Sequence, residues 1–385
     1  MTPGARVAAA IDVLDVILAG AAAEQALTRW ARGNRFAGSK DRAAIRDHVF
    51  DALRCKRSAA ALGGAETGRA IMIGLLRQQG ADLAALFSGQ GHAPAPLDEA
   101  EREHGTPPLE KADLWNLPEW LVPAFEISLG PDASDAARSL QSRAPVSLRV
   151  NTRRMTRDAV ITALANEGIH ADPNPLSKTA VTVADGARRV RASRLFQDGL
   201  IELQDAASQE IVALLPEGGR CLDYCAGGGG KALAMAAAGR QVAAHDIDPR
   251  RMQDLPARAR RAQATIDQID TASLEATAPF DVVLCDAPCS GSGSWRRAPQ
   301  AKWLLTPERL EHLIRLQDDI LDQAIGLVTP KGWLVYATCS LLTSENEDRI
   351  AAFLDRHDDW ICTFQRRFNV TDNGDGFFTA HLTRA

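Results

Sequence analysis

The 385-residue sequence has no long uninterrupted apolar run. Its longest alanine-rich stretch, near residues 8–26, is interrupted by Asp12, Asp15 and Glu24, which is too much charge for a membrane span. Neither an internal repeat nor a secretory signal is recognisable. We therefore expect no membrane partner and a globular chain of two or three domains, because 45% hydrophobic content at this length can bury a substantial core.

The seven cysteines lack the spacing of a metal site. No CxxC pair and no histidine cluster with ligand spacing is present, so we expect no zinc or other metal. The odd number of cysteines, several of them inside apolar runs, is typical of reduced thiols in a cytoplasm. We expect four of them to be small buried side chains, namely Cys55, Cys221, Cys285 and Cys362.

An overall excess of basic charge is also missing, because the net charge is -5. The average hides a segregation of charge along the chain. Residues 6–82 carry twelve Lys or Arg against eight Asp or Glu, and residues 143–157 hold five arginines and no acid. Residues 98–135 instead hold ten acids and two bases. The basic segments are suited to the phosphates of a nucleic acid.

Apolar periodicity divides the chain into four parts. Residues 1–90 show the three-and-four spacing of an all-α domain, and residues 91–143 are expected to form a linker with connecting helices. Residues 144–205 fit a small α+β subdomain. From 206 to 385, strands and helices alternate, which predicts an α/β fold with a doubly wound, Rossmann-like sheet. The tail GDGFFTAHLTR is expected to add a last, antiparallel strand.

A glycine-rich turn connects the first strand of this half to a helix. In LDYCAGGGGKALAMAAAG the strand leads into residues 225–230, and the helix begins near Lys231. Glycines let a ligand approach the backbone closely, and a helix start offers unpaired amides, although such a turn can also serve packing alone. No second glycine fingerprint and no Walker-type lysine turn is present. An adenosyl compound is therefore favoured over a dinucleotide or a triphosphate.

Acidic residues and cysteines end the neighbouring strands. Asp246 follows the next strand, where a carboxylate suits the hydroxyls of a ribose, and Asp270 follows the third; each alone can be an ordinary cap. Cys289 follows the strand that Asp286 ends, in FDVVLCDAPCSGSG, and Cys339 follows WLVYAT. Because the carboxyl ends of parallel strands meet at one sheet edge, we expect the two thiols to share one pocket.

Taken in order, these segments resemble a known family. LDYCAGGGGKALAMAA, DIDPRRM, FDVVLCDAPCSGSGSWRRAPQAKW, LVYATCSLLTSENEDRI and GDGFFTAHL are similar to the S-adenosylmethionine-dependent RNA cytosine-C5 methyltransferases of the Sun and Rsm type. The resemblance covers essentially residues 145–385. In the first domain, SKDRAAIRDHVFDALR resembles the NusB-like RNA-binding module of the bacterial ribosomal RNA members. The alternative for that domain is a helical unit that only packs on the enzyme.

The resemblance implies a role for each matching residue. Cys339 matches the nucleophile that adds to C6 of a pyrimidine, since C5 alone is a poor nucleophile, and Cys289 matches the cysteine of product release. Asp286 would hydrogen-bond the target base. The implied S-adenosylmethionine site consists of Cys225, Ala226, Gly227, Gly228, Gly229, Gly230, Lys231, Asp246, Asp270 and Asp286. The commonest family form has a proline where Gly228 stands, so we expect a more flexible turn here.

RNA contacts are expected on three basic groups of side chains. The first comprises Arg29, Arg32, Arg35, Lys40, Arg42 and Arg46. The second comprises the arginines of SLRVNTRRMTR. The third is implied by the resemblance and comprises Arg296, Arg297 and Lys302.

The expected function is methylation of C5 of a cytosine in structured RNA, with 16S ribosomal RNA as the favoured substrate. The target base would have to leave its stack to reach the thiolate. We expect a cytoplasmic monomer. Transfer RNA or, less favoured, DNA stays open as the substrate, as does a non-catalytic RNA-binding ribosome assembly factor with a disused methyltransferase fold.

Overall fold

The computed structural model describes residues 1–103 and 105–385 and separates into two compact units. His104, inside the predicted linker, lies outside the described residues. The first unit contains Met1–Glu126, Gly130–Arg143 and Trp295–Leu304. The second unit contains Ile127–Leu129, Ala144–Ser294 and Leu305–Ala385.

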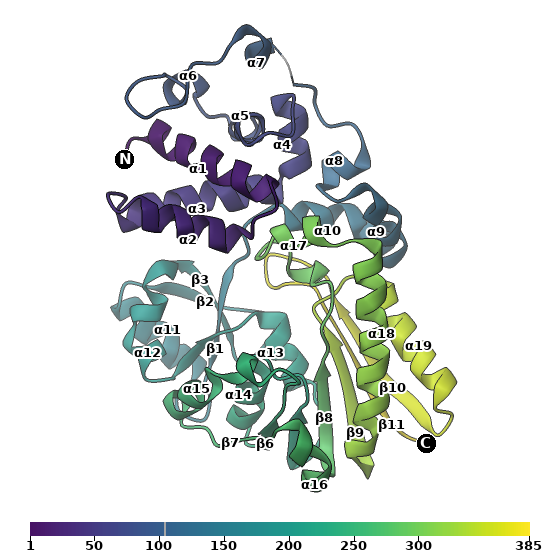
Figure 1. Cartoon of the computed structure of the whole chain (residues 1–385). Coiled ribbons are helices and arrows are strands. Elements are labelled where there is room, and N and C mark those ends of the chain that lie inside the picture. The colour runs from purple at the N-terminus through teal and green to yellow at the C-terminus, as the bar shows by residue number, and fades with distance from the viewer. Residues whose placement is uncertain (104) are drawn as a thin grey trace. The chain divides into compact units, whose positions relative to one another are not determined.

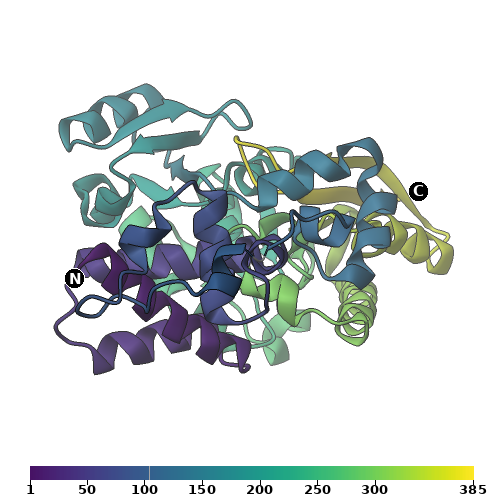
Figure 2. The same cartoon turned by 90° about the horizontal axis from the view of Figure 1, so that it is seen from above.

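The first unit is helical; its part up to Arg143 runs from purple to blue in Figure 1 and Figure 2, and its segment Trp295–Leu304 is green. Its core joins three helices through buried side chains such as Leu14, Val49 and Ile71. These side chains belong to the apolar residues that recur at spacings of three and four in the sequence. The helices are α1 Pro3–Leu18, α2 Ala23–Gly33, α3 Ser39–Arg54, α4 Lys56–Gly63, α5 Gly68–Gln78, α6 Leu83–Leu86, α7 Glu99–Glu103, α8 Lys111–Trp115, α9 Val122–Leu129, which ends in the second unit, α10 Ala133–Leu140 and α17 Gln300–Leu304.

The segment Trp295–Leu304 comes from the second half of the sequence but belongs to this helical unit. Lys302 Nζ donates to the carbonyl oxygen of Arg54 at 2.8 Å, and Arg54 Nε donates to the carbonyl oxygen of Arg296 at 2.8 Å. Arg296 and Lys302 are each 1% exposed. The prediction that these two side chains line an RNA surface is therefore wrong, because they are buried within the unit. Arg297 is exposed.

The second unit begins with a small antiparallel sheet in the order β2-β3-β1-β4. Leu148 and Val150 of its central strand pack with Val160 and Leu164 of a covering helix, and all four are buried. The elements are β1 Val146–Val150, α11 Arg157–Asn166, β2 His170–Pro173, β3 Ala180–Asp185, α12 Arg194–Gln197 and β4 Ile201–Leu203.

The larger sheet has seven strands in the order β10-β11-β9-β8-β5-β6-β7. The strands from β5 to β9 pair in parallel, which confirms the predicted doubly wound α/β fold. The predicted antiparallel last strand is β11, which pairs with β9, whereas β10 was not predicted. The strands are β5 Arg220–Asp223, β6 Gln241–Ala244, β7 Ile266–Gln268, β8 Phe280–Asp286, β9 Val328–Thr338, β10 Trp360–Phe368 and β11 Phe377–Arg384.

Helices cover both faces of this sheet, so each face has its own apolar core (Figure 1). One core contains Leu233 and Leu255, and the other contains Leu321 and Phe353. The helices are α13 Ala206–Ala213, α14 Gly230–Ala237, α15 Leu255–Ala262, α16 Leu274–Thr277, α18 Pro307–Ala324 and α19 Glu347–Arg356. Within the described residues, no helix is both long enough and apolar enough to cross a membrane.

Four cysteines were predicted to be buried. Cys55, Cys221 and Cys285 are buried in the cores, which confirms the prediction for these three. Cys362, on the outer strand β10, is half-buried.

Candidate active site

A cavity of about 530 Å³ lies at the carboxyl ends of β5 and β8. The strand order reverses here, because β6 follows β5 on one side of the sheet while β8 pairs with β5 on the other. Open α/β sheets bind ligands at such a switch point. The predicted site residues that line the cavity are Cys225, Ala226, Gly227, Gly228, Gly230, Lys231, Asp286, Cys289 and Cys339. Gly229, Asp246 and Asp270 do not line it.

The glycine turn between β5 and α14 owes its shape to two residues with left-handed backbone. Gly227 has φ 52° and Gly229 has φ 76°. A Cβ atom on Gly229 would lie 2.3 Å from Leu255 Cδ1, so a larger residue here would have to displace that buried leucine side chain. The glycine turn leads directly into α14. The first main-chain amides of a helix have no partner within the helix and are therefore available to a ligand.

Asp246 supports the turn from behind. Its carboxylate accepts hydrogen bonds from Gly227 N at 2.9 Å and Asp248 N at 3.0 Å, and it pairs with Arg251 at 3.1 Å. The side chain is nearly inaccessible, with 3% exposure for the residue. Arg251 lines the cavity in its place.

Asp270 lies apart from the cavity. Its carboxylate accepts from Ser273 N at 2.8 Å and caps the short 3₁₀ turn Thr271–Ser273. This hydrogen bonding to Ser273 lowers the pKa of the Asp270 carboxyl. In this structure Asp270 therefore acts as a cap.

Lys231 and Asp286 form an ion pair inside the cavity. Lys231 Nζ lies 2.6 Å from Asp286 Oδ2, and the lysine side chain is 8% exposed against 32% for the aspartate. Burial alone would lower the pKa of Lys231, but the charge and hydrogen bond of Asp286 outweigh it and raise the pKa. The lysine is therefore a cation in the cavity wall.

Asp223 is a buried acid behind this pair that the sequence analysis did not select. Burial, together with the nearby charge of Asp286, raises the pKa of Asp223 to about 7. It ends β5, as Asp286 ends β8, so its position at a strand end was the available signal. In its ionised form Asp223 adds to the effect of Asp286 and raises the pKa of Lys231 further.

The two predicted catalytic cysteines lie side by side in the cavity. Cys289 Sγ and Cys339 Sγ are 3.5 Å apart, and Ser294 Oγ is 3.9 Å from Cys339 Sγ. The hydrogen bond from Cys289 lowers the pKa of Cys339, with a further contribution from the Lys231 ammonium. The same contact and burial raise the pKa of Cys289. Cys339 is thus the more acidic thiol of the pair.

A buried carboxylate joins the two cysteine loops. Glu345 is fully buried and accepts hydrogen bonds from Ser290 N at 2.8 Å and from Gln317 Nε2 at 3.0 Å. The hydroxyls of Ser290 and Ser340 both donate to its other oxygen at 2.5 Å. Because Ser290 follows Cys289 and Ser340 follows Cys339, this carboxylate fixes both thiols relative to each other. The sequence analysis missed it.

Two family models and several known proteins match this chain. The family model described as 16S rRNA methyltransferase RsmB/F matches residues 211–383, and the model for an RsmF/B-like ferredoxin-like domain matches residues 117–190. The chain is 35% identical over 284 residues to ribosomal RNA small subunit methyltransferase B of Photorhabdus laumondii, and equally to that of Salmonella arizonae. The alignments cover 69% of this chain and 66% of each relative, just under two thirds of their length.

Two solved structures share the fold. A methyltransferase homologue from Pyrococcus horikoshii superposes with a TM-score of 0.61 at 24% identity, over 72% of this chain and all of that one. NSun6 from the same organism gives 0.59 at 16% identity, over 69% of this chain and 98% of that one.

The doubly wound sheet, with a cavity at its switch point, is the fold that the chain shares with these two solved structures. The chain is therefore similar to the RsmB/F family of 16S rRNA methyltransferases, over residues 211–383 and, in its ferredoxin-like domain, over residues 117–190.

Proposed function

We propose that this protein transfers a methyl group from S-adenosylmethionine to C5 of a cytosine in small-subunit ribosomal RNA. The observation that carries the proposal is the pair of thiols 3.5 Å apart, with the Lys231–Asp286 ion pair lining the same cavity. The names of the two curated relatives support ribosomal RNA over transfer RNA as the substrate. The presence of both thiols and of the strand-end acids argues against a disused fold.

The cavity has the features that an adenosyl cofactor needs. Left-handed Gly227 brings the turn's backbone to the cavity wall, and Arg251 and Asp286 add charged groups there. When bound, the cofactor would supply an electrophilic methyl group. The turn residues would hold its amino acid and ribose parts. Asp246 would contribute by fixing Gly227 N, and its own carboxylate would meet the ribose only if Arg251 moved aside.

Cys339 would begin the reaction. Its thiolate would form a bond to C6 of the cytosine, and the electron pair of the C5–C6 double bond would move to C5, which then takes the methyl group. Asp286 would hydrogen-bond the ring as its charge changes, and Lys231 would stabilise that carboxylate. These groups are held in place before the base arrives.

Cys289 would act at release. Release requires a base that takes the proton from C5, so that the electron pair of the C5–H bond returns to the double bond while the bond between C6 and Cys339 Sγ breaks and its electrons go to the sulfur. Cys289 Sγ lies 3.5 Å from the departing sulfur and can hydrogen-bond to it as it regains its negative charge.

The first unit supports RNA binding through one basic face. The side chains concerned lie on α2, α3 and the turn between them, and all are exposed: Arg29, Arg32, Arg35, Lys40, Arg42 and Arg46. Phe36, in the same turn, is 72% exposed and offers a ring for stacking on a base. Arg46 is paired with Glu24, which reduces its contribution.

A cytoplasmic location fits the thiols. All seven cysteines are free, including the two that are near enough to meet in the cavity. Among the described residues no group of three or more His, Cys, Asp or Glu is placed to hold a metal ion.

Bisulfite mapping of RNA tests the proposal. RNA from cells with and without the protein should differ at a cytosine of the small-subunit ribosomal RNA. Purified protein and S-adenosylmethionine should restore that mark on unmethylated RNA. An unchanged cytosine pattern in every RNA class would refute the function, and a change confined to transfer RNA would correct the substrate.

A further inference from the structure

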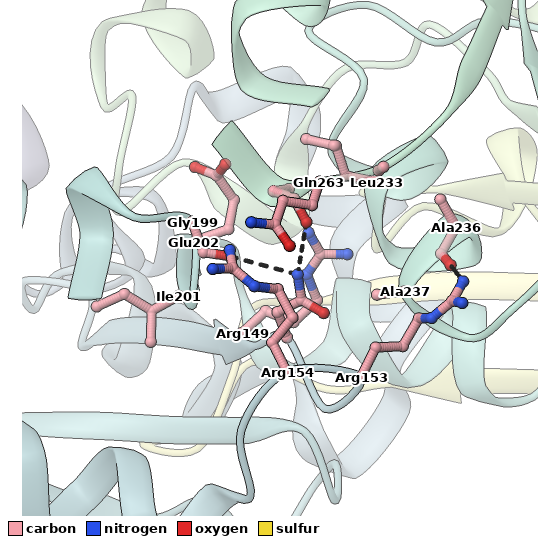
Figure 3. Close-up of a pocket in the computed structure, with 13 residues that line it drawn as sticks. Arg149, Arg153, Arg154, Gly199, Ile201, Glu202, Leu233, Ala236, Ala237 and Gln263 are labelled. Atoms are coloured by element: carbon pink, nitrogen blue, oxygen red, sulfur yellow. Dashed lines mark hydrogen bonds between the residues drawn. The ribbon is translucent and has the colours of Figure 1, made fainter. Parts of the chain in front are cut away.

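A second pocket lies in the second unit, between the small sheet and helices α14 and α15. It has a volume of about 230 Å³ and shares no lining residue with the cavity that holds the cysteines. Figure 3 shows Arg149, Arg153 and Arg154 around it. These arginines belong to the basic segment that the sequence analysis noted and that the proposed reaction does not use.

Arg149 is the buried arginine of this pocket. It lies on β1, is 6% exposed, and its Nη1 has no hydrogen-bond partner among the described residues. Glu202 stands opposite it on β4, but that carboxylate is engaged by Arg261 at 2.8 Å and by Arg258 at 3.4 Å. Burial lowers the pKa of Arg149 to about 10. A buried guanidinium with an unused donor is costly unless an anion or a water meets it.

The other two arginines are fixed at the pocket by hydrogen bonds to main-chain carbonyls, one for Arg153 and two for Arg154. Arg153 Nη1 donates to Ala236 O, near the end of α14, at 3.4 Å (Figure 3), and Arg154 Nη1 donates to Asp198 O. A guanidinium has five N–H donors, so these bonds position each side chain and leave donors for a ligand. Because Arg258 and Arg261 already balance Glu202, the pocket keeps an excess of positive charge.

The pocket also contains an unused acceptor. Asn151 Nδ2 donates to Ala262 O at 3.0 Å and to Gly199 O at 3.3 Å, which fixes the orientation of the amide. Asn151 Oδ1 is buried and has no hydrogen-bond donor among the described residues. An anion alone would not satisfy this oxygen, whereas a ligand that carries both a phosphate and a hydroxyl would.

The geometry points to a ribose-phosphate of the RNA substrate as the ligand of this pocket, with the three arginines on the phosphate and Asn151 on a sugar hydroxyl. The described lining includes no aromatic ring for base stacking, and its apolar part consists of Ile201, Leu233 and alanines such as Ala236. Contacts to the sugar-phosphate backbone, which position RNA without reading its sequence, fit that lining. This inference rests on the proposed RNA methyltransferase function.

RNA binding by variants of the full chain tests the inference. In the double variant Arg153→Gln/Arg154→Gln, affinity for the RNA substrate should fall by about tenfold or more near 0.1 M salt, and the slope of log affinity against log salt should shrink by about 1 to 2. Arg149→Met should show the same direction of change. Calorimetric binding of S-adenosylmethionine should stay unchanged and shows that each variant is folded.

Arg250→Gln is the matched control, because this arginine is in the same unit, its side chain is 86% exposed, and among the described residues it pairs with Asp248 alone. It should bind RNA as the wild type does. If the pocket variants bind RNA with unchanged affinity and salt slope while the wild type is active, the inference is overturned. If they lose binding of inorganic phosphate or ribose 5-phosphate but keep RNA binding, the pocket serves a small anion and the RNA assignment is wrong. A wild type that neither binds nor methylates RNA contradicts the proposed function itself.

Discussion

Cys289 Sγ and Cys339 Sγ lie 3.5 Å apart although 50 residues separate them in the sequence. The contact arises because β8 and β9 are parallel neighbours whose carboxyl ends meet at one edge, and because Glu345 binds both following loops. The anionic carboxylate near Cys289 and the Lys231 ammonium near Cys339 act on the thiols in opposite directions. The pair is therefore electrostatically asymmetric before any substrate binds.

The first prediction concerns thiol reactivity. At about pH 7.5, Cys339 should react with iodoacetamide at least about tenfold faster than Cys289, because one unit of pKa changes the thiolate fraction tenfold below the pKa. Peptide mass spectrometry of the alkylated protein measures both rates. In Cys289→Ala the alkylation rate of Cys339 should fall, because alanine removes the hydrogen-bond donor that faces its sulfur. Equal rates in the wild type would contradict the assigned asymmetry.

The second prediction concerns the buried cation. Lys231→Met should raise the pKa of Cys339 and leave Asp286 without its partner, so methyl transfer near neutral pH should fall by about 100-fold or more. The pH at which activity reaches half its maximum should move upward, because more alkaline conditions are needed to form the thiolate. Lys331→Met, at an exposed lysine of β9, is the control and should keep wild-type rates. A lower rate with an unmoved pH profile would mean that the lysine does not act on the thiol.

The third prediction concerns Glu345. In Glu345→Gln the serine hydroxyls can reverse to meet the amide, so the loops should stay joined while the negative charge near Cys289 is lost. The pKa of Cys289 should fall toward its ordinary value, and the two alkylation rates should approach each other. S-adenosylmethionine binding should not change. Asp348→Asn, at an exposed acid three residues further on, should leave both rates as they are.

The fourth prediction concerns the stability of the helical unit. Burial lowers the pKa of Lys302 to about 7, well below its value near 10.4 in an unfolded chain. Between these values the unfolded state binds the proton and the folded state does not, so this lysine makes folding more favourable as pH rises from about 7 to 10.4. Relative to Lys302→Met, the wild type should gain up to about 1.4 kcal/mol of unfolding free energy per pH unit in this window.

Denaturant unfolding of the full chain at several pH values, followed by tryptophan fluorescence, measures this difference. Lys178→Met, at an exposed lysine, should show none of it. A difference between wild type and Lys302→Met that does not vary with pH would show that Lys302 is charged in the folded protein.

Sequence patterns predicted the parts of the site that depend on local order. Apolar runs followed by Cys289, Cys339 and Asp286 identified strand ends, and the rules of parallel sheets then brought them to one edge. The glycine turn was predictable for the same reason, because its residues are contiguous. The role of Asp246 was harder to predict, because its carboxylate accepts a hydrogen bond from Gly227 N instead of facing the open cavity.

Contacts between distant segments could not be predicted. Arg296 and Lys302 look like surface cations, because charged residues are rarely buried. The burial of Lys302 depends on the main-chain carbonyl of Arg54, which is 248 residues away in the sequence. In the sequence Glu345 likewise looks like an ordinary acid before a helix. Its role depends on the hydrogen bond from Ser290, which is 55 residues away in the sequence. Arg149 has an unused donor because Arg261 pairs with Glu202 instead. Which arginine pairs with this carboxylate depends on packing and cannot be seen in the sequence.

In the proposed mechanism Cys339 attacks the base and Cys289 acts at release. Covalent trapping on RNA that contains 5-fluorocytosine tests these two roles most directly. We expect the wild type to form a stable protein–RNA adduct, Cys339→Ala to form none and to transfer no methyl group, and Cys289→Ala to accumulate an adduct even on ordinary RNA. Normal turnover by Cys339→Ala would contradict the central claim, and Cys289→Ala with full turnover and no adduct would remove its role in release.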